Sequence, residues 1–201
     1  EGSLVTNIMY NSTGMLIYAG CGAVIDQNDV PGAGQDTHTY TPTDDLPFFT
    51  VTLGKGNNGQ ERFVGMMVSS WSLSIEAGGL MEGTFNFIGK TSDARSGAAL
   101  SPSFSTGNVD VRHFDAGTMA FNSVNYNLRS MTFSCDNKVE RRDLLGSKQS
   151  AQMGTTDIKE VTLECTADLE DNNIYNAQLD GTAGDVVISF SQGTGAAAHS
   201  F

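Results

Sequence analysis

Apolar and polar residues alternate along the segment around Trp71. Trp71, Leu73 and Ile75 are separated by single serines, and alternation with a period of two is typical of a strand with one buried face. A second alternating segment, residues 81–87, follows the turn Ala77-Gly78-Gly79. The two segments and the glycine turn between them predict a β-hairpin.

The same pattern occurs again sixty positions further along the chain. Residues 128–135 match residues 68–75 in their apolar and hydroxyl residues, apart from the second position of each segment, and residues 161–163 correspond to residues 85–87. The turn in the second copy is longer and spans about residues 136–157. We therefore expect an internal duplication of one hairpin, with an enlarged tip in the second copy.

Weaker signals predict the remaining elements. Further strands are expected at residues 48–53, 109–111 and 186–190, and a strand continuing to Leu169 is expected from Val161. A single short helix is expected over about 171–180. It would be capped by Asp168 or Asp171 and would turn Ile174, Ala177 and Leu179 inward.

Together these elements predict an all-β fold, an antiparallel β-sandwich or partly closed barrel with duplicated hairpins and one short flanking α-helix. We expect an N-terminal arm or irregular segment over 1–45, the β-sandwich domain over 46–192, and a C-terminal arm over 193–201. Composition agrees with strands and turns, since the chain has 23 glycines in 201 residues and only 17% charged residues.

The net charge of the chain argues against nucleic acid as a tightly bound partner. The formal net charge is −12, whereas proteins that bind nucleic acid tightly neutralise phosphates with Lys and Arg. No apolar run approaches the roughly 18–20 residues of a membrane helix. The first residues, Glu1-Gly2-Ser3-Leu4, lack the basic region of a signal peptide. We expect neither a membrane protein nor a tight binder of DNA or RNA.

Candidate catalytic motifs each have a simpler structural explanation. Gly89-Lys90-Thr91 lacks the first glycine of a phosphate-binding loop and follows a strand without a helix after it. Glu76 and Glu82 flank one turn and resemble an acid/base pair for glycoside hydrolysis, but acidic residues at a hairpin turn are usually solvated. The three histidines lie far apart, and no Gly-x-Ser-x-Gly motif is present. We expect no enzyme.

Cysteine and tryptophan positions indicate a core, not a cofactor site. Cys135 and Cys165 occupy apolar positions of the alternating segments, as Trp71 does. Cys21 is the third cysteine, and no Cys-x-x-Cys pair exists. We therefore expect no metal and no cofactor.

The long turn at 136–157 is a candidate contact surface. It holds four basic and four acidic residues and is neutral, while the remainder of the chain carries all of the net negative charge. Leu144-Leu145 lies at its centre. Mixed charge around an apolar pair suits docking on a neighbouring subunit, although a solvated loop would have the same composition.

Several segments together resemble the tail tube proteins of long-tailed bacteriophages. The resemblance rests on Leu46-Pro47-Phe48-Phe49-Thr50-Val51, the serine-rich strand 70–76 with Gly78-Gly79, and the return strand 82–90 with its Gly-Thr-Phe sequence. The longer second hairpin and the Asp-rich segment from Asp168 to Tyr175 also fit. It covers roughly residues 46–190, and similar proteins are often longer at the N-terminus.

The resemblance implies a virion protein that is assembled in the host cytoplasm and works by polymerising. Six copies would close into a ring, and rings would stack into a hollow tail tube through which the genome passes during ejection. The partners would be other copies of the chain, tape measure protein and tail terminator or tip proteins. DNA would be transient cargo that does not stick, because a negative wall repels phosphate.

Two sets of residues are expected to serve this assembly. The first would line the channel: Glu76, Glu82, Asn86, Thr162, Glu164 and Asp168. The second would make contacts between rings or between subunits: Lys138, Arg141, Arg142, Leu144, Leu145 and Lys148. The alternatives are a carbohydrate-binding β-sandwich, such as an adhesin or tail-tip module, and a hydrolase on a β-scaffold. The former requires clustered exposed aromatics, and the latter requires a nucleophile or metal cluster.

Overall fold

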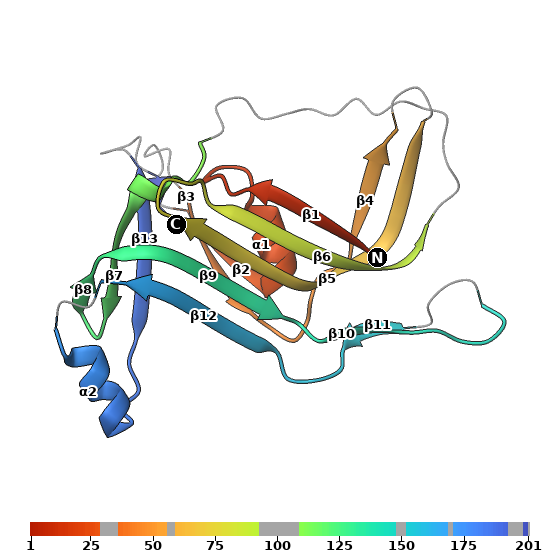
Figure 1. Ribbon diagram of the computed structural model, residues 1–201. Helices are drawn as coiled ribbons and strands as arrows, with labels where there is room; N and C mark the ends of the chain where they lie inside the picture. Colours follow the sequence, from red (N-terminus) through yellow and green to blue (C-terminus); the bar gives the residue numbers. More distant parts are fainter. Residues whose placement is uncertain are drawn as a thin grey trace.

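The fold is built around one antiparallel sheet of six strands (Figure 1). The computed structural model describes residues 1–28, 36–55, 59–92, 109–147, 152–168, 171–192 and 199–200. The strand order is β1-β6-β5-β9-β12, and β4 pairs with the first part of the long strand β5. The strands are β1 (Gly2–Asn7), β4 (Phe49–Gly54), β5 (Gln60–Glu76), β6 (Glu82–Ser92), β9 (Leu128–Asp136) and β12 (Glu160–Ala167).

The register confirms both predicted hairpins and the duplication of their first strands. In the first hairpin Trp71 of β5 lies opposite Phe85 of β6, and in the second the equivalent Met131 of β9 lies opposite Cys165 of β12. Phe85 therefore corresponds to Cys165, and the expected match of residues 85–87 to residues 161–163 is wrong because the second turn is longer than that match allows. The two copies meet through β5 and β9, which run antiparallel, and the equivalent residues Leu73 and Phe133 face each other. A local two-fold axis therefore passes between the two hairpins at this pair.

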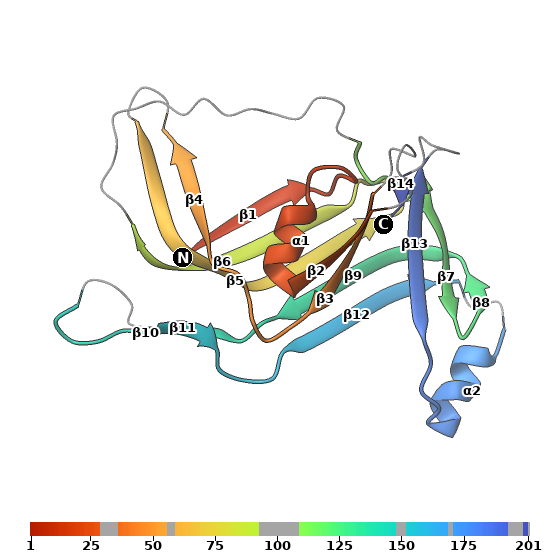
Figure 2. The same cartoon turned by 180° about the vertical axis from the view of Figure 1, so that it is seen from behind.

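One face of the sheet carries the core. Trp71, Leu73 and Ile75 of β5 point to this face together with Phe85 of β6, and all four are buried. The α-helix α1 (Gly14–Cys21) lies over them, as the rear view shows (Figure 2). Gly20 allows this close packing, because a Cβ there would lie only 2.7 Å from Cδ1 and Nε1 of the Trp71 ring.

Smaller elements complete the structure. Four of them form a second sheet in the order β14-β13-β7-β8, and four more form two separate pairs, β2 with β3 and β10 with β11. The second sheet contains β7 (Ala116–Phe121), β8 (Val124–Tyr126), β13 (Val186–Gln192) and β14 (His199–Ser200). The two pairs contain β2 (Gly22–Asn28), β3 (Asp36–Pro42), β10 (Val139–Arg142) and β11 (Gln152–Thr155). The all-β antiparallel prediction is thus confirmed, and the strands of the described part close no barrel.

The N-terminal 45 residues hold more regular structure than an arm. They contribute β1 to the edge of the main sheet, α1 to the core, and the β2–β3 pair. The sequence pattern does not predict α1, since its eight residues are nearly all apolar or small and lack a 3.6-residue period. The division into domains stays a prediction.

Segment 109–111 forms bridges and backbone hydrogen bonds instead of a full strand. The Val111 amide donates to the Ile8 carbonyl (3.0 Å), and the Val111 carbonyl accepts from the Met81 amide (2.8 Å). Ile8, Met81 and Val111 are completely buried. Three distant segments of the chain are joined at this point, and the predicted strand is only two isolated bridges, Met9 to Asp110 and Leu80 to Arg112.

The predicted C-terminal helix is present as α2 (Asn173–Asp180). Its N-cap is Asn172, not Asp168 or Asp171, and no side chain caps it. Asp171 precedes the cap and accepts from the Asn173 amide at 2.9 Å and from the Tyr126 hydroxyl at 2.7 Å. Ile174 and Ala177 are half-buried, as expected, whereas the expectation for Leu179 is wrong: it is exposed, because α2 lies outside the sheet layers (Figure 1).

Candidate functional site: a polar sheet face, an open edge and a projecting hairpin

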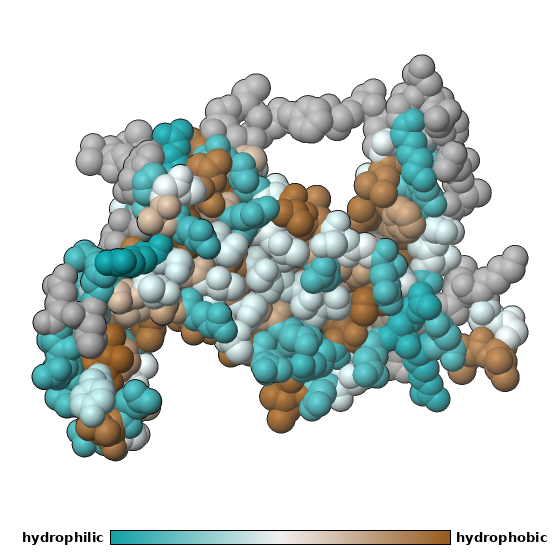
Figure 3. All heavy atoms as spheres, viewed as in Figure 1, coloured by the Kyte–Doolittle hydropathy of each residue, from teal (hydrophilic) through white to brown (hydrophobic). Residues whose placement is uncertain are grey.

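The face of the main sheet opposite α1 is hydrophilic across four strands. Cross-strand partners share a face, so the register defines a surface that we call the polar face. Its middle row runs Thr84, Ser72, Ser134 and Thr162. The complete set is Glu82, Thr84, Asn86, Ser70, Ser72, Ser74, Glu76, Ser130, Thr132, Ser134, Asp136, Glu160, Thr162, Glu164 and Thr166. Figure 3 views this face, and pale and teal side chains dominate it between β6 and β12.

Short polar side chains on this face pair with each other across the strands. The Asn86 amide donates to Ser70 Oγ at 2.9 Å, and the hydroxyls of Ser134 and Thr162 lie 2.6 Å apart. These pairs satisfy hydroxyl and amide groups without long side chains, so the surface is smooth as well as polar. Five of its fifteen residues are acidic and none is basic.

Five of the six residues expected to line a channel lie on the polar face: Glu76, Glu82, Asn86, Thr162 and Glu164. The sixth, Asp168, follows a β-bulge at Thr166/Ala167 and forms an ion pair with Arg129 at 2.6 Å. Sequence reasoning omitted Asp136 and Glu160, which share the face. Both residues could have been predicted, because they occupy polar positions of the alternating pattern in β9 and β12.

Lys138 lies at one end of the polar face, not at the hairpin tip. Its Nζ contacts Asp136 Oδ2 at 2.7 Å and Glu160 Oε2 at 3.1 Å, so it joins the ends of β9 and β12. The hydrogen bonds from Lys138 hold the pKa of Asp136 below its ordinary value. We expected Lys138 among the contact residues of the long turn. It lies instead at the base of that turn.

The long turn contains its own two-stranded ladder. β10 and β11 pair from Val139–Thr155 to Arg142–Gln152, and this hairpin extends beyond the main sheet at the end opposite α2 (Figures 1 and 2). Near its tip Arg141 pairs with Asp143 at 2.9 Å, Leu144 is exposed and Leu145 is fully exposed. Lys148 lies outside the described residues.

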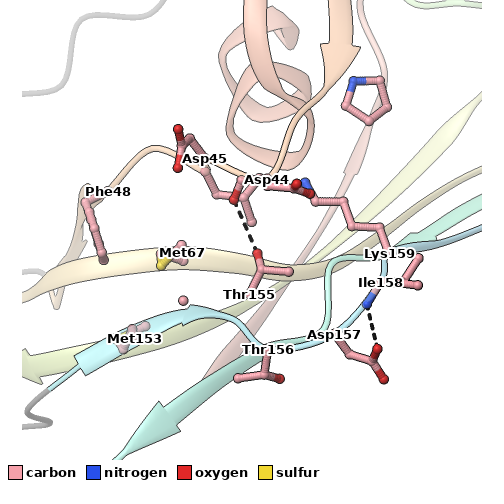
Figure 4. A pocket seen from close by; sticks show the side chains of 13 residues that line it. Asp44, Asp45, Phe48, Met67, Met153, Thr155, Thr156, Asp157, Ile158 and Lys159 are labelled. Carbon is pink, nitrogen blue, oxygen red and sulfur yellow. Dashed lines mark hydrogen bonds between the residues drawn. The ribbon is translucent and has the colours of Figure 1, made fainter.

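A groove of about 970 Å³ lies at the base of this hairpin (Figure 4). Its floor is apolar, with the buried residues Leu46, Met67 and Met153, and the exposed side chains of Phe48 and Ile158 stand at its margin. Its rim is mainly acidic, with Asp44, Asp45 and Asp157 around one cation, Lys159. Partial burial lowers the pKa of Lys159, whose Nζ donates to the Thr43 carbonyl.

The outer edge of the main sheet at β12 is open. β12 pairs with β9 on one side, and no strand of the described chain pairs with its other side. On its core-facing side Val161 and Leu163 remain 48% and 41% exposed. An unpaired edge flanked by exposed apolar side chains is a template for strand pairing with another chain.

The other candidate sites do not assemble. Glu76 and Glu82 lie on the polar face among serine and threonine residues, and His38 and His113 are in separate elements, β3 and the 3₁₀ turn His113–Asp115. In the parts of the chain that the structure describes, no three His, Cys, Asp or Glu side chains are grouped as metal ligands. Neither described helix is long and apolar enough to span a membrane.

The cysteines pack within or against the core. Cys21 and Cys135 are buried and Cys165 is half-buried, and all three are free thiols. Burial raises the pKa of Cys21 to about 11, so its thiol stays protonated and unreactive at neutral pH. Cys135 and Cys165 behave as the small hydrophobic residues that their positions predict.

These features define a structural protein whose chemistry is that of surfaces: a smooth acidic face, an open edge and a projecting hairpin. The chain matches the family described as phage tail tube protein over residues 1–201, and it belongs to that family. The match includes residues 1–45, for which the sequence resemblance was less clear. A search of curated proteins gives no match. The protein is therefore a structural component of a phage virion tail, which assembles with copies of itself and with other tail components.

Proposed function

We propose that six copies of this chain close into a ring and that stacked rings form a hollow tube whose bore is lined by the polar face. The observation that carries the proposal is the polar face itself. A surface four strands wide with five carboxylates, two of them paired with Lys138 at one end, is unsuited to packing in a core and suited to a water-filled channel.

Ring closure would use the two ends of the sheet. Among the strands that the structure describes, β12 is open at one end of the sheet, and β1, which pairs with β6 on one side, is open at the other. A contact between unlike edges is heterologous, and repeated with a fixed rotation it closes a ring. Such closure removes both edges and covers Val161 and Leu163.

The charge of the polar face would serve DNA passage. Phosphates bind proteins through Lys and Arg with release of counterions, and the polar face offers carboxylates instead. Repulsion between wall and cargo keeps the duplex in the centre of the bore, where it slides without local binding sites. The same carboxylates in each of six copies would make the field continuous around the ring.

Negative-stain microscopy of the purified chain tests the assembly. Hollow rods are expected, and discrete small particles under all conditions would contradict the proposal. Leu163→Lys places a charge beside the open edge and should abolish rods, whereas Leu163→Ile, which keeps the apolar surface, should not.

Accessibility labelling tests which face lines the bore. Ser134→Cys lies at the centre of the polar face, and Met15→Cys on α1 is an exposed control on the opposite side of the sheet. In rods, Ser134→Cys should react with a small maleimide but not with one carried on a polymer too large for the bore. Met15→Cys should react with both. Equal reaction of Ser134→Cys with the large reagent in intact rods would place the polar face outside.

A further inference from the structure

The tip of the β10–β11 hairpin presents two adjacent apolar side chains that no described part of the chain covers. Leu144 is 52% exposed and Leu145 is fully exposed, and the hairpin holds them away from the body of the molecule (Figure 1). Single exposed leucines are ordinary on protein surfaces. An adjacent pair at the end of a projecting, hydrogen-bonded hairpin forms a compact apolar knob.

The groove at the base of the same hairpin offers the complementary surface. Met67, Met153 and Leu46 form an apolar floor, and Phe48 and Ile158 extend it to the margin (Figure 4). Methionine side chains adapt their shape to an inserted group. The tip and the groove of one molecule lie at opposite ends of the hairpin. Leu144 and Leu145 of one copy can therefore contact only the groove of another copy.

The tip lacks the negative charge that most of the chain carries. Residues 139–147 hold two basic and two acidic side chains and are neutral, on a chain whose net charge is −12. The groove has three carboxylates, Asp44, Asp45 and Asp157, against one Lys159. Copies of this acidic chain repel one another on most of their surface, whereas the neutral tip approaches the acidic groove without net repulsion.

The direction of the hairpin indicates which copy it reaches. Strands pair sideways, so a ring closed through the edges of β12 and β1 grows perpendicular to the strands. β10 and β11 continue along the strand direction of β9 and β12, beyond the end of the sheet (Figures 1 and 2). The hairpin therefore leaves the plane in which the ring closes and points toward the adjoining ring.

We propose that Leu144-Leu145 at the tip of one copy seats in the groove bounded by Asp44, Asp45 and Ile158 of a copy in the adjoining ring. This inference rests on the proposed ring-and-tube function and names the two surfaces that join its rings. Tip and groove are different surfaces, so the contact is heterologous, and each copy gives one tip and receives one. Stacking can then continue without limit.

Cross-linking between two single variants tests the pairing directly. Leu145→Cys and Ile158→Cys, distinguished by a size tag, are mixed, assembled into rods and treated with a short bismaleimide. A mixed dimer on a denaturing gel is expected. In the matched control Met15→Cys replaces Ile158→Cys; the two sites are similarly exposed at 80% and 86%. The untagged parent chain reports any reaction of the three native thiols.

The outcomes separate this inference from the proposed function. A mixed dimer with Ile158→Cys and none with Met15→Cys supports the pairing. Rods that give no dimer, or equal dimer with both partners, overturn the tip–groove contact and leave the tube intact. If no rods form from the parent chain, both the tube and the pairing fail.

Removal of the apolar knob gives a second measurement. The double variant Leu144→Ser/Leu145→Ser should leave unfolding unchanged, because both side chains are exposed in the single copy. It should raise the concentration needed for rods at least about tenfold, which is the equivalent of losing one buried aliphatic side chain. Met15→Ser is the control. Rods at an unchanged concentration would overturn the inference.

Discussion

The first hairpin, β5–β6, and the second, β9–β12, have the same pattern of apolar and hydroxyl residues, yet their apolar sides lie in different surroundings. In the first, Trp71 stacks on Phe85 with ring centroids 6.1 Å apart, beneath α1, and β1 covers the outer edge of β6. In the second, Val161 and Leu163 are partly exposed and the outer edge of β12 is open. The local two-fold axis relates the hairpins but not their coverings.

This difference shows how a duplicated module acquires two roles. Burial of the first hairpin is completed within the chain, so it stabilises the single copy. Burial of the second is incomplete without a neighbour, so its apolar side is available for assembly. An alternating sequence pattern predicts that one face of a strand is buried. It does not specify whether the residues that bury this face belong to the same chain or to a neighbouring copy.

Truncation of core-side residues in the two return strands should reveal the largest difference. Phe85 of β6 and Val161 of β12 both lie on the core-facing side of the main sheet. Phe85→Ala should destabilise the dispersed chain by about 4 kcal/mol, since Phe85 is completely buried, while Val161→Ala should cost less than about 1 kcal/mol. Urea unfolding below the assembly concentration measures both. Equal losses would show that the second hairpin is buried in the single copy as well.

The residues that follow the two matching strands sharpen the comparison. Asn137 matches Ala77, but its side-chain amide is buried and donates to the carbonyls of Gly20 (3.0 Å) and Val68 (3.1 Å). Asn137→Ala should cost about 3 kcal/mol because two buried carbonyls lose their donor. The matched Ala77→Asn, at an exposed turn, should change the free energy of unfolding by less than about 0.5 kcal/mol.

Close packing of α1 on the first hairpin predicts an unusual glycine effect. Alanine normally favours a helix over glycine by about 1 kcal/mol, yet Gly20→Ala places a methyl group against the Trp71 ring. We expect a net loss of about 1–2 kcal/mol, because overpacking in a core costs roughly 1–3 kcal/mol. Gly154→Ala in β11 is the control, since a Cβ there meets nothing within 4 Å. A stabilising Gly20→Ala would contradict the tight contact.

The smallest expected effect is a pH dependence in the second hairpin. The pKa of Asp136 is lowered from 3.8 by its hydrogen bonds with Lys138, so folding favours the ionised carboxylate. Its stabilisation is present above about pH 4 and is lost as the pH falls through the lowered pKa. Both groups are partly solvated, so the loss should be a few tenths of a kcal/mol.

Comparison with Lys138→Met isolates this pair. Thermal or urea unfolding between about pH 5 and about pH 2 should show a smaller decline for the variant than for the parent chain. Parallel curves would mean that Lys138 does not stabilise ionised Asp136.

Local patterns in the sequence predict those parts of the fold that depend on neighbours along the chain. Period-two alternation predicts both hairpins, and the match of residues 128–135 to 68–75 predicts the duplication. The polar face follows from the same alternation, which is why five of its residues were anticipated. The contact of Asp171 with the start of α2 is equally local, since it depends on the Asn173 amide two residues away.

Long-range contacts explain what the sequence left open or predicted wrongly. α1 forms in a segment without helical periodicity because its apolar side chains meet the sheet, and Gly20 has its role only through Trp71. Leu179 was expected in a core, but it is exposed because α2 lies outside the sheet layers and only Ile174 and Ala177 of its apolar residues are half-buried. The side chain of Asn137 bridges Gly20 and Val68, which are distant in sequence, so no spacing rule indicates that it is buried.

The sequence by itself determined the alternating strands, their duplication and the acidic charge, because each depends on side-chain order along the chain. Only the tertiary structure decided that the two copies meet antiparallel at Leu73 and Phe133, that one is covered and the other open, and that the long turn projects as a hairpin beside an acidic groove. Those features depend on packing between distant segments, whose free energy is not contained in any single stretch of sequence.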